Sequence, residues 1–292
     1  MTVSFSASRG QANVAPSALR KVVAPFVNPG IFDFWVGKLN PAWSWDRPLA
    51  RVVERKVEAL DTVTLVLKPN AHCGRFVPGQ HINVTAEVNG RRTTRSYSHT
   101  DVPRPDGRVS LTIKRVDNGV LSTHLCQHVQ VGDVLELGAA FGEMTLPAKP
   151  EGEWLFLAAG SGITPLMSLT RSLAAQNMPI DLTLIYWAKT RAELCFAREL
   201  RALAVKHPRF KVQFVLENEA QLLQGEASGL ISATQLADLV GSLSAKQVYA
   251  CGPSGFVDAA RKLSEGQSRS FMAEGFTPMA PLSVADAATP TV

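Results

Sequence analysis

The chain has 292 residues, enough for two domains of ordinary size. A hydrophobic content of 46%, a charged content of 19% and a net charge of +5 are typical of a globular protein, and mild basicity suits phosphorylated ligands. The sequence contains no Lys/Arg block typical of nucleic-acid binding, no membrane-spanning apolar run and no signal-peptide core. We therefore expect a cytoplasmic protein that does not bind nucleic acid.

Residues 1–47 form an N-terminal arm that differs from the rest of the chain. After a small, polar start, aromatic and aliphatic side chains follow one another from Leu19 to Trp45, with Lys21 and Lys38 among them. Aromatic residues flanked by lysines suit a membrane interface, which would place the protein at the periphery of a membrane. The alternative, which we favour, is that the arm packs its aromatic side chains against the domain that follows.

Residues 48–148 alternate between apolar and polar side chains, as β-strands do. Strands are predicted at residues 62–67, 81–88, 109–115 and 131–138, with turn signals between them and one helix from Leu121 to about Val129. Several short alternating strands at this spacing predict a closed antiparallel β-barrel.

From residue 149 to 278 the pattern changes to apolar strands that alternate with amphipathic helices. The strands are predicted at residues 154–159, 182–187, 211–216, 247–250 and 270–273, and two of the helices at residues 190–205 and 253–263. This order predicts an α/β domain with a parallel sheet. Residues 279–292 have the composition of a linker-like tail.

A strand, a glycine turn and a helix start follow one another around Gly160 and Gly162. We expect Thr164 to cap the helix and Pro165 to occupy its first position, because proline lacks the N–H that this position leaves unused. Free N–H groups at a helix start favour a diphosphate. A tight structural connection remains the alternative, since Pro165 stands where a dinucleotide fingerprint has its third glycine.

The stretch Arg95-Ser96-Tyr97-Ser98 ends a predicted barrel strand. Alternation places Arg95 and Tyr97 on one face, and Ser96 and Ser98 on the other. Arginine pairs with diphosphates, a tyrosine ring covers flat aromatic ligands and a serine hydroxyl hydrogen-bonds ring nitrogens. An ordinary strand with a surface arginine is the alternative.

Four short motifs, in this order, resemble those of the ferredoxin–NADP reductase superfamily. They are Arg-x-Tyr-Ser at 95–98, Gly-x-Gly-x-x-Pro at 160–165, Cys251-Gly252-Pro253 and Glu274-Gly275-Phe276. The resemblance covers roughly residues 48–278 and is greatest to the reductases of oxygenase and acyl-desaturase systems. It implies a barrel that binds FAD and an α/β domain that binds NADPH or NADH. It also implies a [2Fe–2S] ferredoxin as acceptor, and as a further partner an oxygenase or a membrane-bound fatty acyl desaturase.

The resemblance also implies roles for individual residues. Ser98, Cys251 and Glu274 would be catalytic. The FAD site would comprise His81, Arg95, Ser96, Tyr97, Ser98, Ile113, Lys114, Arg115, Gly119, Val120, Leu121 and Ser122. The nicotinamide site would comprise Gly160, Gly162, Thr164, Pro165, Cys251, Gly252 and Pro253, with Phe276 nearby. Each of three residues also has a purely structural alternative. Ser122 could be a helix cap, Cys251 a buried apolar position and Glu274 a surface carboxylate.

Two features bear on partners and on the coenzyme. No four-cysteine iron–sulfur pattern follows Phe276, and we expect no metal site in this chain, so the ferredoxin is either a separate protein or a missing C-terminal domain. Lys189 and Arg191 follow the second strand of the α/β domain, where two cations favour the 2′-phosphate of NADPH; a solvated helix start is the alternative. A flavin-binding redox sensor without turnover is the rival function.

Overall fold

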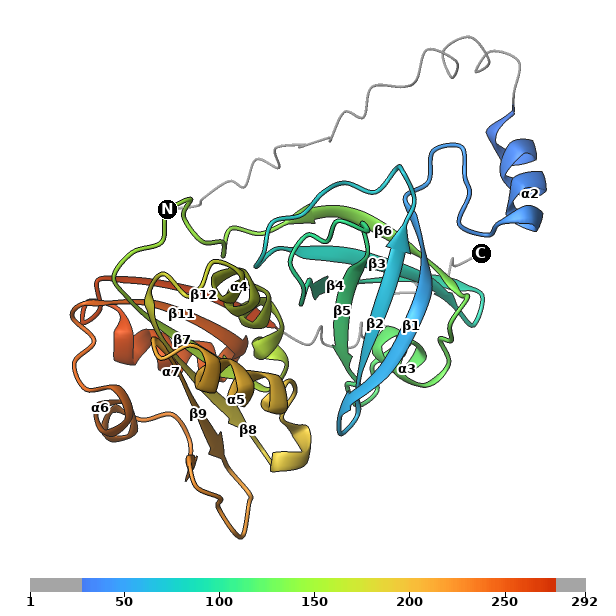
Figure 1. Ribbon diagram of the computed structural model, residues 1–292. Helices are drawn as coiled ribbons and strands as arrows, with labels where there is room; N and C mark the ends of the chain where they lie inside the picture. The colour runs from blue at the N-terminus through green and yellow to red at the C-terminus, as the bar shows by residue number, and fades with distance from the viewer. Residues whose placement is uncertain (1–27, 277–292) are drawn as a thin grey trace, which may run out of the picture.

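Two six-stranded sheets divide the chain in the computed structural model, which describes residues 28–276 (Figure 1). The first sheet is antiparallel, in the order β4-β3-β6-β1-β2-β5. The helix α3 (Val120–Gln127) lies between β5 and β6 in the chain. Its strands are β1 (Leu49–Ala59), β2 (Thr62–Pro69), β3 (His81–Val88), β4 (Arg91–Ser98), β5 (Val109–Lys114) and β6 (Val134–Phe141).

The edge strands β4 and β5 of this sheet meet where β4 ends. His99 forms a bridge with Leu111, and the Thr100 N–H donates to the Ser110 carbonyl at 3.0 Å. Alternating side chains such as Leu65 point into a buried apolar interior, which α3 helps to cover. The expected antiparallel barrel is therefore confirmed, and its apolar interior is the main source of its stability.

The second sheet is parallel, in the order β10-β9-β8-β7-β11-β12. Buried residues on one face pack with α4 (Ile163–Ala175) and α5 (Ala197–Lys206), and those on the other with α6 (Ala233–Val240) and α7 (Ser254–Ser264). The predicted α/β domain is confirmed. Its strands are β7 (Glu153–Ala159), β8 (Asp181–Ala188), β9 (Phe210–Leu216), β10 (Glu226–Ser228), β11 (Lys246–Pro253) and β12 (Ser270–Phe276).

Side chains from the α/β domain bond directly to the barrel. The Ser168 hydroxyl on α4 donates to the Asp101 carbonyl at 2.6 Å, and Arg171 on the same helix donates to the Thr100 carbonyl. Lys114 at the end of β5 forms an ion pair with Glu193. These contacts place the ends of β3 and β4 beside the carboxyl end of β12.

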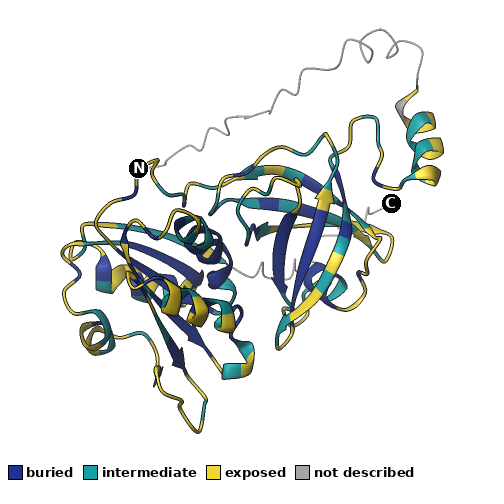
Figure 2. Cartoon of the chain, viewed as in Figure 1, coloured by how far each residue is buried: buried dark blue, intermediate teal, exposed yellow. Residues whose placement is uncertain are grey.

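The N-terminal arm contains a helix, α2 (Pro29–Leu39), that lies on the far side of the barrel from the α/β domain (Figure 1). Phe32 packs edge-on against Trp45 at 5.1 Å, and Asp33 accepts hydrogen bonds from Ser44 and from the Trp45 N–H. However, the apolar side chains on the opposite face are exposed (Figure 2). The expectation that the arm buries its aromatic residues against the barrel is wrong for this face.

Three local predictions were also wrong. The helix expected at residues 190–205 begins only at Ala197, because Arg191–Glu193 form a separate short turn and Phe196 has a left-handed backbone (φ 58°). The strand expected at residue 131 begins at Val134, because Gly132 (φ 104°) makes a turn. Thr164 does not cap α4: the helix already begins at Ile163, continuing the turn Gly160–Gly162. The expectations for residues 1–27 and 277–292 lie outside the described residues.

None of the helices that the structure describes between residues 28 and 276 combines the length and the apolar character needed to cross a bilayer. Within the same residues, no group of histidine, cysteine and acidic side chains is arranged to hold a metal ion.

Candidate functional site at the boundary of the two domains

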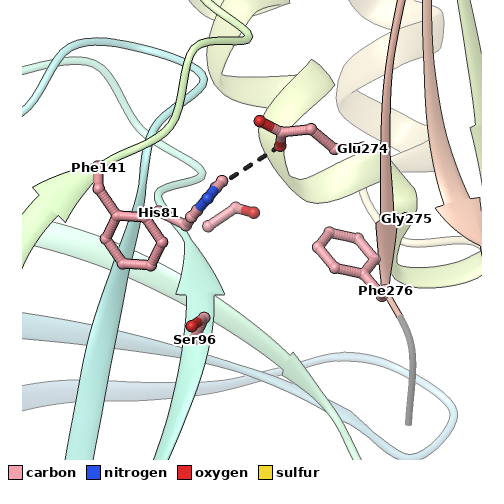
Figure 3. Close-up of a pocket in the computed structure, with 7 residues that line it drawn as sticks. His81, Ser96, Phe141, Glu274, Gly275 and Phe276 are labelled. Carbon is pink, nitrogen blue, oxygen red and sulfur yellow. Dashed lines mark ion pairs between the residues drawn. The ribbon is translucent and has the colours of Figure 1, made fainter. Parts of the chain in front are cut away.

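A pocket of about 310 Å³ lies where the barrel meets the end of β12 (Figure 3). His81 on β3 and two serines of β4 contribute from the barrel, and Glu274 contributes from the α/β domain. Ser96 and Ser98 share the pocket, which confirms that they lie on one face of their strand. The full lining is His81, Ser96, Ser98, Phe141, Glu274, Gly275 and Phe276.

Three buried polar atoms around this pocket have no hydrogen-bond partner among residues 28–276. They are the Ser98 hydroxyl, His81 Nδ1 and Glu274 Oε2. Both ring nitrogens of His99 are likewise buried and unpaired. Leaving such groups unpaired costs about 1–3 kcal/mol each, so a cluster of them indicates a site built for a polar ligand.

His81 and Glu274 approach each other across the domain boundary, with 3.6 Å between Nδ1 and Oε2 (Figure 3). Burial lowers the pKa of His81 and raises the pKa of Glu274. The distance would suit an ion pair, but both pKa directions favour the uncharged forms, because burial desolvates both groups. The Phe141 ring meets the His81 ring edge-on at 4.4 Å, which holds the imidazole in place.

The other predicted residues of β4 face different surroundings. Arg95 is exposed and its guanidinium donates to the neighbouring Thr94 carbonyl at 2.7 Å. Tyr97 packs against the barrel core, and this burial raises the pKa of its hydroxyl. The Ser96 hydroxyl donates to Asn83 at 2.7 Å. Arg95 and Tyr97 do not line the pocket that Ser96 and Ser98 share.

The second predicted stretch of the barrel, residues 113–122, uses many of its polar groups internally. Ile113 is buried in the core, and Arg115 pairs with Asp61 at 3.0 Å. The Ser122 hydroxyl accepts from the Val116 N–H and donates to the Gly119 carbonyl, at 3.1 and 3.3 Å. Gly119 stands at the N-cap of α3 without a side-chain cap, and it is followed by exposed Val120 and buried Leu121.

The glycine turn after β7 lies at the point where the order of the parallel strands reverses. β7 and β11 are neighbours, but the chain leaves them for opposite edges of the sheet. A β-carbon on Gly162 would lie 1.9 Å from the Cys251 carbonyl oxygen, so only glycine allows the turn to approach β11 this closely. Gly160 has φ 53° and open space beside it. Ligands of open α/β sheets bind at such reversal points.

Thr164 and Pro165 are buried in the first turn of α4, where the Thr164 hydroxyl donates to the Ser161 carbonyl at 2.9 Å. Cys251 is fully buried, which raises the pKa of its thiol. In the strand register it lies opposite Ala158 of β7 and Glu274 of β12. Through this register the sheet brings Cys251 beside the pocket. Gly252 and Pro253 follow it and pair with Gly275 and Phe276.

Lys189 and Arg191, the two cations after β8, differ in their surroundings. Lys189 is exposed and forms no ion pair within residues 28–276. Arg191 pairs with Glu219 at 3.1 Å and with Glu226 at 2.7 Å. Neither carboxylate was predicted from the sequence, since both lie far along the chain, in the segment around β10. Phe141, the last residue of β6, was not predicted either, because no motif marks this position as part of a site.

Comparisons with known proteins agree with this architecture. The model of an oxidoreductase FAD-binding domain matches residues 50–146, and that of an oxidoreductase NAD-binding domain matches residues 156–262. The chain belongs to the ferredoxin reductase family. In this protein the barrel is the FAD-binding domain of the family, and the parallel α/β unit is its NAD-binding domain.

Two curated relatives come from Mycobacterium tuberculosis. An NADPH oxidoreductase is 36% identical over 84% of this chain and 64% of its own length. The ferredoxin reductase component of a 3-ketosteroid-9-alpha-monooxygenase is 37% identical over 64% of this chain and 50% of its own. The chain thus spans less than two thirds of either relative. The FAD/NAD-binding domain of a nitric oxide dioxygenase from Vibrio cholerae superposes with a TM-score of 0.70 at 26% identity, covering 80% of this chain and all of that domain.

Proposed function

We propose that this protein is a flavoprotein reductase that carries electrons from NADPH or NADH, through FAD, to a [2Fe–2S] ferredoxin. The observation that supports this most directly is the pocket at the domain boundary. Buried, unpaired polar groups of the FAD-binding domain face Glu274 of the NAD-binding domain there. A flavin ring bound in this pocket would be reachable from the nicotinamide site.

FAD, when bound, supplies the exchange between two-electron and one-electron transfer. The residues of this chain would hold and orient it. Arg95, exposed on the barrel surface, and the N–H groups of residues 120–122 at the start of α3 suit its diphosphate. The Ser98 hydroxyl suits a hydrogen bond to the flavin ring, and Ser96, Tyr97 and His81 would lie close by. Ile113, Lys114 and Arg115 would form the wall of the site on β5.

The nicotinamide coenzyme would bind where β7 and β11 diverge. Gly160 and Gly162 let the backbone approach its diphosphate, and Thr164 and Pro165 hold the start of α4 behind them. Cys251, with Gly252 and Pro253, would lie beside the nicotinamide ring, because the register sets Cys251 next to Glu274. Glu274, whose pKa is raised by burial, would hold a proton near the reacting atoms, with Phe276 packed at the flavin edge.

We further propose that the ferredoxin serves an oxygenase or a fatty acyl desaturase, and that the N-terminal arm keeps the reductase at the periphery of a membrane. The relative that is a monooxygenase reductase component supports an oxygenase. A ferredoxin on a separate chain or in a C-terminal domain would both fit, because the M. tuberculosis relatives are longer than this chain.

The absorption spectrum of the purified protein tests this proposal. We expect flavin bands that NADPH or NADH bleaches without oxygen, and rapid return of colour on addition of a [2Fe–2S] ferredoxin. A flavin-bound protein that neither nicotinamide bleaches would contradict the reductase assignment and would favour a redox sensor. If NADPH or NADH bleaches the flavin but no ferredoxin reoxidises it, only the proposed acceptor would be wrong.

A further inference from the structure

One face of α2 has the pattern of a core-facing helix but faces solvent. Ile31, Phe34, Trp35, Lys38 and Leu39 recur at the spacing i, i+3, i+4, i+7 and i+8, which places them on a single stripe. The exposed fractions are 62% for Ile31, 58% for Phe34, 62% for Trp35 and 80% for Leu39. A helix buries such a face, so the pattern indicates a partner for it.

The opposite face of α2 is the one that attaches the helix to the barrel. Asp33 binds Ser44 and the Trp45 N–H, Phe32 packs on Trp45, and Asn40 at the helix end accepts a hydrogen bond from Arg51 of β1. These contacts fix the direction in which the stripe points. The helix lies on the side of the barrel away from the domain boundary (Figure 1), and its stripe residues are exposed (Figure 2).

The chemistry of the stripe favours lipid over protein. Lys38 stands in the middle of it, with its ammonium 4.5 Å from the centre of the Phe34 ring and 5.1 Å from that of Trp35. In an apolar protein groove this ammonium would be buried and would need a partner charge. At a bilayer surface the lysine stem covers apolar surface while the ammonium reaches the phosphates, and tryptophan prefers the same depth.

Charge and length point the same way. Residues 1–45 contain Arg9, Arg20, Lys21 and Lys38 but only one acid, Asp33, which is engaged on the opposite face. This end of the chain is therefore cationic and complements an anionic surface. With 11 residues α2 is about 16 Å long, far short of the ~30 Å core of a bilayer, so it would lie flat.

We propose that α2 lies in the headgroup region of a bilayer that contains anionic phospholipids, with the stripe Ile31-Phe34-Trp35-Lys38-Leu39 inserted. This deepens the peripheral placement proposed above by naming the side chains and the lipid, and it does not depend on the identity of the electron acceptor.

Flotation of the full-length flavoprotein with vesicles tests the proposal. We expect binding to vesicles of equal parts phosphatidylcholine and phosphatidylglycerol, and weaker binding to phosphatidylcholine alone. Trp35→Glu with Leu39→Glu should weaken binding at least ~10-fold, because two apolar side chains lose their burial. Lys38→Glu should weaken it about 5-fold or more on the anionic vesicles only.

The matched control carries Val205→Glu with Leu230→Glu, two apolar side chains of the α/β domain that are 87% and 68% exposed. It should float like the wild type. Equal loss in this control, or a wild type that does not float, would overturn the proposal. The proposal would also be overturned if light scattering showed that the wild type is a dimer and that only the stripe variant is a monomer. A second copy of the chain would then cover the stripe. Bleaching by NADPH, measured on every variant, reports the reductase function separately.

Discussion

At the scale of single residues, Ser98 carries a buried hydroxyl without a hydrogen-bond partner in the described residues. Its hydroxyl is buried at the end of β4, only 2% of the residue is exposed, and no acceptor or donor among residues 28–276 reaches it. Ser110, on the neighbouring edge strand, is equally buried, but its hydroxyl donates to Asp101 at 3.1 Å. The unpaired Ser98 hydroxyl is therefore available to a ligand, whereas the Ser110 hydroxyl is not.

We predict that Ser98→Ala slows the bleaching of the flavin by NADPH about 10-fold while changing flavin affinity less than ~3-fold. A hydrogen bond to the reacting ring acts mainly in the transition state and is worth about 1.5 kcal/mol. Stopped-flow absorbance at saturating NADPH and flavin titration of the stripped protein measure the two quantities. Ser110→Ala, the control, should bleach at the wild-type rate, and a Ser98→Ala rate equal to it would remove the assigned role.

At the scale of elements, the turn after β8 brings together groups from distant segments. Glu226 in β10 has a side chain without exposed surface and accepts hydrogen bonds from both Arg191 and Arg201. Hydrogen bonds from Arg191 lower the pKa of this carboxyl, so it stays charged. Arg191 thus holds the turn against β10 through its ion pair with Glu226. Lys189, the other cation after β8, forms no such ion pair within the described residues.

From this geometry we predict a preference for NADPH that depends mainly on Lys189. Lys189→Ala should lower the ratio of kcat/KM for NADPH to that for NADH by about 10-fold, the value of one charge-assisted contact. Arg191→Ala should change the ratio less but lower the Tm, because it removes one partner of a shielded carboxylate. Lys211→Ala, at the opposite end of the strands, is the control. A wild-type preference for NADH would contradict the prediction.

The strands were predictable because their side chains alternate or form short apolar runs, and the glycine turn after β7 because few residues allow it. The start of α5 was not, since Phe196 takes a left-handed backbone that nothing in its type demands. The prediction that Thr164 caps α4 was also wrong, because Thr164 follows a turn that is already helical. Of the residues that line the pocket, the sequence predicted His81, Ser96, Ser98, Glu274 and Phe276. Phe141 was not predicted, because it reaches the pocket through the pairing of β6 with β3.

At the scale of the whole molecule, His81 and Glu274 join the two domains through a contact that depends on pH. Burial holds the Glu274 pKa above its ordinary value, so between the two values the folded chain keeps a proton that the unfolded chain has lost. Stability contributed here therefore falls as pH rises through that window. For His81 the pKa is lowered, so its cost appears as pH falls below its ordinary value near 6.5.

We predict that Glu274→Gln gains stability relative to the wild type as pH rises from 4 to 7, because a neutral amide avoids the cost of a buried carboxylate. Urea midpoints of both proteins across this range measure the difference. Glu265→Gln, at an exposed glutamate after α7, is the control and should show no such trend. A constant difference between Glu274→Gln and wild type at all pH values would refute the linkage.

The strand β12 ends at Phe276, which lines the pocket, so the last described residue lies at the site. An electron acceptor joined to that end would be held at high local concentration, and its encounter with the site would be first-order, indifferent to dilution. An acceptor on a separate chain would meet the same site at a rate proportional to its own concentration. For an acceptor domain attached after β12, covalent attachment rather than affinity would therefore set the rate of electron transfer.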